Sequence, residues 1–278
     1  MTYEHLIAAL CLFLAGCGTT AMNASRTDPQ GLMRQQALSG GPDDVPRTDR
    51  SHHLYVLLLK SQNAFSTDAE RERLWAALRG EDARYVELLG NLNDVPMDYR
   101  IEYVFNHTTP NAKNAEMHLI KPWLKRLSRT ERSRASQAKT VLLVKGNLFR
   151  LPNSQDVRLT LAGLLFLAET YDGIIVDLLS RKAMAATELR TLLEAPGRLA
   201  SQIRFVGGRV DGQLGVRTAG LPKYGFPDVF LPTETPTTAV KRLGLVVDAL
   251  MTGEALPSGV SPRRCKKSRL DFGCYRID

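Results

Sequence analysis

The sequence predicts an α+β fold with mixed sheets packed against helices, and three observations support this class. Short runs that are almost wholly apolar, as in buried strands, occur at 54–60, 140–145 and 174–179. A long apolar helix is expected between the last two runs. Later strands are separated by short turns such as Asp211-Gly212, which favours antiparallel pairing.

Composition and local patterns define the other elements. The chain has 278 residues, 44% hydrophobic and 24% charged, which excludes a wholly disordered or collagen-like protein. Thr67 and Glu70 form a capping-box pattern that begins a helix with Leu74, Trp75 and Leu78 on its buried side, ending at Gly80. The remaining expected elements are strands at 99–106, 116–120, 203–209 and 214–218 and helices at 185–193 and 238–251.

The clearest unit is the strand–helix–strand segment 140–179. Its helix is capped at Asn153 or Ser154 and continues to Tyr171, and it is apolar almost all round. Because charged residues lie within it, we expect a core helix rather than a membrane span. The two strands are expected to pair in parallel through a right-handed crossover. One arrangement that this order allows is a pair of ferredoxin-like halves, at 54–139 and 140–253.

The N-terminus has the features of an export signal. Residues 6–14 are apolar but too few to span a bilayer, which is typical of a signal peptide. Leu14-Ala15-Gly16-Cys17 then resembles the lipobox of bacterial lipoproteins. The resemblance implies that residues 1–16 are removed and that Cys17 carries the lipid. Gly18, where inner-membrane lipoproteins have Asp, implies an outer-membrane protein facing the periplasm.

The residues before the apolar run depart from the usual pattern of a signal peptide. The residues before the apolar run include no Lys or Arg, whereas a signal peptide usually begins with positive charge. The start of the chain could therefore be misassigned.

Residues 17–53 contain few large apolar side chains, so we expect a flexible tether. The adjacent His52 and His53 at its end are expected to be solvated rather than to bind a metal.

The four cysteines divide by position. Cys11 lies in the predicted signal peptide, and Cys17 is the predicted lipid attachment site. Cys265 and Cys274 are expected to form a disulfide in an oxidising periplasm, within a basic C-terminal tail at 254–278. The alternative is a pair of free thiols.

The most distinctive motif is the loop 215–228, in which glycines recur at Gly215, Gly220 and Gly225. No Lys-Ser/Thr pair follows any of them, so the loop is not a P-loop. The glycines are expected to take positive φ angles in a tight turn. Together with the segment 172–177, this loop resembles an uncharacterised family of bacterial α+β domains, which implies a shared fold but no established activity. If the loop binds a ligand, the candidate residues are Arg217, Lys223, Tyr224 and Asp228; the alternative is a structural loop.

Other catalytic patterns are absent from the sequence. There is no Gly-x-Ser-x-Gly elbow, no His-Glu-x-x-His and no Cys-x-x-Cys. Asp172 and Asp177 are five residues apart and should point to opposite faces of a strand. His107 and His118 are weaker candidates, which an enzyme based on the loop 215–228 could use. We predict no catalytic residue, metal or cofactor.

The positive charge is concentrated. Lys and Arg number 37 against 29 Asp and Glu, a net charge of +8. A helix beginning at Pro122 is expected, with Trp123, Leu124 and Leu127 packed inwards. Its outer face would be basic, through Lys125, Arg126, Arg129, Arg132 and Arg134. Such a face attracts anionic lipid or lipopolysaccharide; the alternative is an ordinary solvated surface.

These observations favour a membrane-anchored cell-envelope lipoprotein that acts as a non-catalytic binding or scaffolding module for an unknown envelope partner. One alternative is an envelope enzyme that uses the Arg217–Asp228 loop. Another is a cytosolic nucleic-acid-binding protein with a misassigned start.

Overall fold

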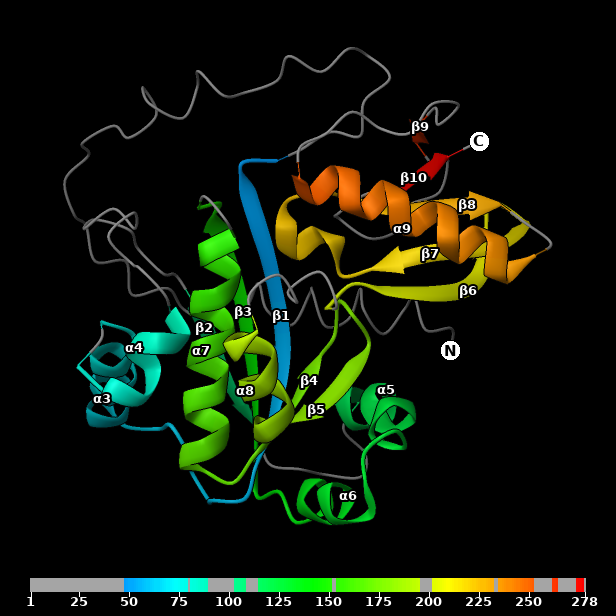
Figure 1. The fold of residues 1–278 in the computed structure, drawn as a ribbon. Helices are drawn as coiled ribbons and strands as arrows, with labels where there is room; N and C mark the ends of the chain where they lie inside the picture. Colours follow the sequence, from blue (N-terminus) through cyan, green and yellow to red (C-terminus); the bar gives the residue numbers. More distant parts are fainter. Residues whose placement is uncertain are drawn as a thin grey trace.

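The structure is a computed structural model that describes residues 48–79, 81–89, 103–108, 115–151, 154–195, 202–232, 235–252, 262–264 and 274–277. The predicted signal peptide, Cys17, the tether up to residue 47 and Cys265 lie outside the described residues. The described chain forms two five-stranded sheets with helices packed on them (Figure 1), so the predicted α+β class is confirmed.

The first sheet is antiparallel throughout, with the strand order β2-β3-β1-β4-β5. Strand β1 lies in its middle and pairs along its whole length with β3 and, over Tyr55–Leu58, with β4. The strands are β1 (Arg50–Leu59), β2 (Tyr103–Thr108), β3 (Thr140–Phe149), β4 (Ile174–Asp177) and β5 (Lys182–Ala185).

The predicted parallel pairing of β3 with β4 is wrong. The two strands do run in the same direction, but β1 lies between them and is antiparallel to both. The sheet therefore does not divide at 139 and 140, because β1, which precedes that boundary, pairs with β3 and β4, which both follow it. Local patterns show which segments are strands, but not that an earlier strand is inserted between two later ones.

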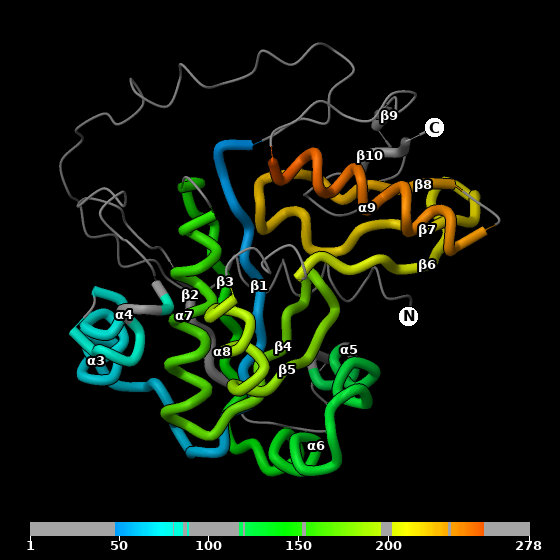
Figure 2. The backbone as a smooth tube through the Cα atoms, in the orientation of Figure 1, coloured from blue at the N-terminus to red at the C-terminus, as the bar shows by residue number. Residues whose placement is uncertain are grey.

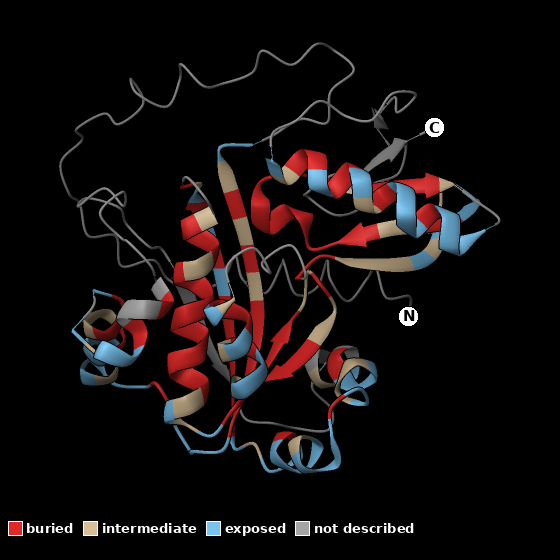
Figure 3. Cartoon of the chain, in the orientation of Figure 1, coloured by how far each residue is buried: buried red, intermediate tan, exposed pale blue. Residues whose placement is uncertain are grey.

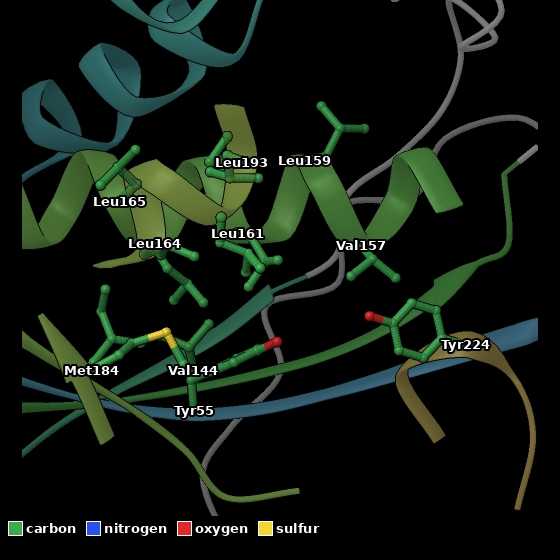
Figure 4. Packing of buried hydrophobic residues seen from close by; sticks show 14 of the residues in the cluster. Tyr55, Val144, Val157, Leu159, Leu161, Leu164, Leu165, Met184, Leu193 and Tyr224 are labelled. Atoms are coloured by element: carbon green, nitrogen blue, oxygen red, sulfur yellow. The ribbon is translucent and has the colours of Figure 1, made fainter. Parts of the chain in front are cut away.

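One face of the first sheet is covered by four helices, with α7 (Gln155–Thr170) at the centre (Figure 1). Its residues from Gln155 to Ala168 are all buried apart from Arg158, as predicted for a core helix. In Figure 4, Leu161 and Leu164 of this helix point towards the sheet, where Tyr55, Val144 and Met184 lie, whereas Leu159 and Leu165 point away from it. The other three helices are α3 (Asp68–Leu78), with the predicted Thr67–Glu70 capping box, α4 (Ala83–Leu89) and α8 (Ala186–Glu194).

The opposite face is covered by α5 (Ala115–Leu124) and α6 (Arg129–Ser136). The strand expected at 116–120 is thus wrong, and so is the single basic helix beginning at Pro122. Met117, Ile120 and Leu124 follow helical spacing and pack against this face. Pro122 lies inside α5, and Ser128 begins α6 with a capping box of its own.

The second sheet has the order β6-β7-β8-β10-β9 and is mixed, since β8 and β10 are parallel. The turn at Asp211-Gly212, with both φ angles positive, joins β6 to β7 as an antiparallel hairpin, as predicted. The strands are β6 (Arg204–Val210), β7 (Gln213–Ala219), β8 (Asp228–Pro232), β9 (Pro262–Arg264) and β10 (Cys274–Ile277), with helix α9 (Pro236–Thr252) packed on one face.

A continuous hydrophobic core joins the two sheets. The cluster under α7 also contains Val216, Val229 and Leu231 of the second sheet and Leu243 of α9. Figure 3 shows this buried interior extending from α7 through β1 to the second sheet.

The folded part begins earlier than the tether prediction allows. Arg50–His53 belong to β1, and His53 is 1% exposed rather than solvated. Ahead of the strand, the Thr48 amide donates to the Gly225 carbonyl oxygen at 2.8 Å. Figure 2 shows that β1 begins near the loop of the second sheet that contains Gly225 and ends at the side of the first sheet where α6 lies.

Candidate functional site

The sequence-predicted loop folds against the first sheet as a short 3₁₀ turn, η5 (Leu221–Tyr224). Gly220 and Gly225 flank it with φ angles of 113° and 78°, as predicted, but Gly215 lies within strand β7 and does not have the positive φ angle expected of it. A Cβ atom at Gly225 would lie 2.9 Å from the Thr48 carbonyl oxygen and would also overlap the Arg150 side chain. The glycines therefore allow the close approach that turns Lys223 and Tyr224 into the interior.

Lys223 is the centre of a buried polar group that we call the junction cluster: Asp177, Ser180, Gln202 and Lys223. The Lys223 Nζ atom lies 2.5 Å from Asp177 Oδ2, 2.6 Å from Ser180 Oγ and 3.4 Å from the Gln202 carbonyl oxygen. An ammonium group has three protons, and each has an acceptor here. The cluster therefore links the end of β4 to the loop between β7 and β8.

The junction cluster has the residue types of a serine–lysine catalytic pair but not the access. The Ser180 hydroxyl accepts from Lys223, and its one proton has acceptors at Gln202 O, 2.5 Å, and Asp177 Oδ2, 2.8 Å. Asp177, Ser180 and Lys223 are each 0% exposed. Burial lowers the pKa of Lys223, and the adjacent Asp177 carboxylate opposes that shift. This geometry is that of a structural ion pair.

A second line of buried polar groups runs beside the cluster. His53 Nε2 lies 3.0 Å from Ser51 Oγ, and burial, followed by the charge of Lys223, lowers the His53 pKa to about 3. Asp156 Oδ1 accepts from the Leu151 amide at 3.2 Å, and burial raises the pKa of Asp156 to about 6. His53 Nδ1 and Asp156 Oδ2 have no hydrogen-bond partner within the described part of the chain.

The four predicted ligand residues are not gathered in one open site. Lys223 and Tyr224 are buried, whereas Arg217 and Asp228 are partly exposed. Figure 4 shows the Tyr224 hydroxyl pointing towards Val157 of α7. Asp228 Oδ1 instead accepts from Thr218 Oγ1 at 3.1 Å and from the Leu221 amide at 3.3 Å. The loop is thus held from inside by two separate sets of polar contacts.

The remaining candidates lie elsewhere. Asp172 is at the surface, whereas Asp177 is buried. The Asp172 carboxylate lies 3.3 Å from Lys60 Nζ and 3.6 Å from Arg134 Nε. His118 is exposed on α5, and the side chain of His107 on β2 is not described. Among the described residues, no group of three or more His, Cys, Asp or Glu side chains could hold a metal ion.

The predicted basic surface is exposed on α5, α6 and the turn between them. Lys125, Arg126 and Arg129 form no ion pair with any described residue. Arg132 donates to the carbonyl oxygens of Lys125 and Leu127, at 3.0 and 2.7 Å, and so holds the turn. Arg134 is the exception, because it lies beside Asp172. We use the name basic face for Lys121, Lys125, Arg126, Arg129 and Arg132.

Within this surface the one acidic residue of α6 has a local partner. Glu131 accepts a hydrogen bond from the Ser128 amide at 2.8 Å as part of the capping box. Its carboxylate therefore serves the start of α6.

Sequence reasoning missed the junction cluster, although one signal was present. Asp177 ends an apolar strand, and Lys223 lies in an apolar loop 46 residues later. A charged residue in a buried segment requires a partner of opposite charge. Which residue is that partner depends on the packing of the two sheets.

Comparison with known proteins leaves the function open. The chain matches no known protein family, and neither a curated protein nor a solved structure is significantly similar to it. No helix in the described part of the chain has the length and apolar character needed to cross a membrane.

Proposed function

We propose that the protein is a lipid-anchored cell-envelope protein that acts as a non-catalytic binding module. The observation that carries this proposal is Leu14-Ala15-Gly16-Cys17 after a short apolar run, ahead of a fold whose first strand begins at Arg50. Gly18 favours the outer membrane, with the module facing the periplasm.

The geometry of the loop favours binding over catalysis. A nucleophile needs a free proton acceptor beside it and a path for the substrate. The carboxylate that accepts from Ser180, Asp177, is already paired with Lys223, and all three residues are buried. An enzyme that used Lys223 of this loop would have to break its ion pair to Asp177 before a substrate could reach it.

Attachment of lipid to Cys17 is tested by growing cells that express the full chain with radioactive palmitate. We expect label in the wild-type protein, and none after Cys17→Ala. Cys11→Ala is the matched control and should keep the label, because that residue lies before the predicted cleavage site. An unlabelled wild-type protein in the cytoplasmic fraction would exclude the lipoprotein function and would favour the nucleic-acid-binding alternative.

The predicted disulfide between Cys265 and Cys274 gains support from strand register. Arg264 of β9 is opposite Tyr275 of β10 in an antiparallel pair. Cys265, which lies outside the described residues, follows Arg264 in the sequence, and Cys274 precedes Tyr275, so the same register continued by one position would set the two cysteines opposite each other. Opposed residues in such ladders have Cα atoms roughly 4.5–5.5 Å apart, a separation that a disulfide can bridge.

This disulfide should be detectable by mass spectrometry of the protein isolated from the envelope without reduction. We expect a peptide containing both cysteines linked, with a mass about 2 Da below that of the dithiol form. Thiol alkylation before denaturation should leave both residues unmodified. Alkylation of either cysteine in the unreduced protein would contradict the prediction.

A further inference from the structure

We propose that the basic face binds the anionic phospholipid headgroups of the membrane that anchors Cys17, so that the protein is attached at two points. This inference rests on the proposed function for the anchor, but the binding of the face is a separate property. The partner chemistry is a phosphate-bearing lipid surface.

The basic face forms no ion pair with an acidic side chain of the described residues, and Glu131 is the one acidic residue of α6 among its five positive charges. All five members of the face are exposed. Arg132 keeps its positive charge while it holds the turn, because both of its acceptors are neutral carbonyl oxygens. Each Lys or Arg near an anionic membrane surface strengthens partitioning roughly fivefold.

The surface also has a residue suited to the boundary between headgroups and acyl chains. Trp123 of α5 packs against the core of the first sheet, yet part of its side chain remains exposed. Trp is enriched at membrane interfaces, where its ring lies at the level of the headgroups. The neighbouring Pro122 is exposed as well. A partly exposed Trp beside unpaired cations fits a lipid surface better than it fits water alone.

The distance from Arg50 to the basic face is similar to the reach of the segment that would connect Arg50 to the lipid on Cys17. The segment between α6 and β3 meets the far end of β1, where the Lys139 amide donates to the Leu59 carbonyl oxygen at 2.8 Å. The anchored segment joins the other end, at Arg50, and a ten-residue strand is about 33 Å long. Roughly 30 residues separate Cys17 from Arg50, and a flexible chain of that length has an average reach of about 30 Å.

This match has a thermodynamic consequence. A linker whose average reach equals the distance between two binding points gives the highest effective concentration for the second contact. Once the lipid is inserted, even weak binding by the basic face would hold the module against the membrane.

The test uses the chain from Gly18 to Asp278, the mature polypeptide without its lipidated cysteine. We expect it to co-sediment with vesicles that contain phosphatidylglycerol in phosphatidylcholine, and not with vesicles of phosphatidylcholine alone. Lys125→Gln, Arg126→Gln and Arg129→Gln together should weaken partitioning about a hundredfold, roughly fivefold for each charge. Binding by the wild type should fall as salt is raised from 50 to about 500 mM.

A charge-matched variant separates the basic face from net charge. Arg73→Gln, Lys241→Gln and Arg242→Gln remove three exposed cations from α3 and α9, and this variant should bind like the wild type. Equal losses in both triple variants, or binding to DNA fragments but not to vesicles, would overturn the proposal. If the protein binds vesicles but the full chain is not labelled by palmitate, the proposed lipid anchor is wrong and the proposed membrane binding by the basic face stands.

Discussion

Replacing Lys223 by Met should lower the free energy of unfolding by about 3 to 5 kcal/mol, because Asp177 would be left charged and buried without its partner. Met occupies a similar volume, so the loss would come from the missing charge rather than from a cavity. The measurement is urea-induced unfolding at pH 7, followed by circular dichroism.

Two further variants distinguish the effect of breaking the buried ion pair from the effect of removing any lysine. Lys60→Met removes a half-exposed partner of Asp172 and should cost less than about 1 kcal/mol. Asp177→Leu combined with Lys223→Met removes both buried charges and should recover part of the loss. A Lys223→Met protein as stable as the Lys60→Met protein would show that the ion pair does not hold the two sheets together.

Replacing Asp156 by Asn should stabilise the protein above pH 6 and have little effect near pH 4. Burial raises the pKa of Asp156 from 3.8 to about 6, so the folded state holds this proton more tightly than the unfolded state does. Its contribution is complete below about pH 4 and is lost as pH rises through 6. A shift of about two pKa units corresponds to roughly 3 kcal/mol, of which we expect Asn to recover at least 1.

This prediction is tested by the free energy of unfolding of both proteins at several pH values from 4.5 to 7.5. The wild-type curve should fall more steeply, and the two curves should diverge as pH rises. Asp172→Asn, which removes an exposed carboxylate instead of a buried one, is the control. Parallel curves for the wild type and the Asp156→Asn protein would contradict a proton held on Asp156.

Local sequence patterns predicted most elements because their signals are local. The capping box of Thr67 and Glu70, the glycines of the η5 loop and the turn at Asp211-Gly212 are each defined by a few neighbouring residues. The segment 116–120 failed because its alternation suits a strand, whereas burial at Met117, Ile120 and Leu124 selects a helix. Strand β5 was missed because Lys182–Ala185 has little strand character apart from its pairing with β4.

The candidate site depended on contacts that a local pattern does not contain. His53 was expected to be solvated because its neighbours in sequence are polar, but β1 extends far enough to bury it. Lys223 was identified as a candidate, yet its partner could be found only once β4 and the η5 loop were placed together. The basic residues were easier, since charges at the surface need no partner to be recognised.

The central position of β1 determines how the fold would carry mechanical load. If the membrane pulls on the chain ahead of Thr48 along the axis of the strand, the tension enters the sheet through its middle rather than at an edge. Hydrogen bonds to β3 and β4 would then resist in shear together, because β1 is paired on both sides from Tyr55 to Leu58. An edge strand pulled along its axis would be held by hydrogen bonds to one neighbouring strand only. A protein attached to a moving surface through β1 would therefore unfold at a higher force than one attached through an edge strand such as β2 or β5.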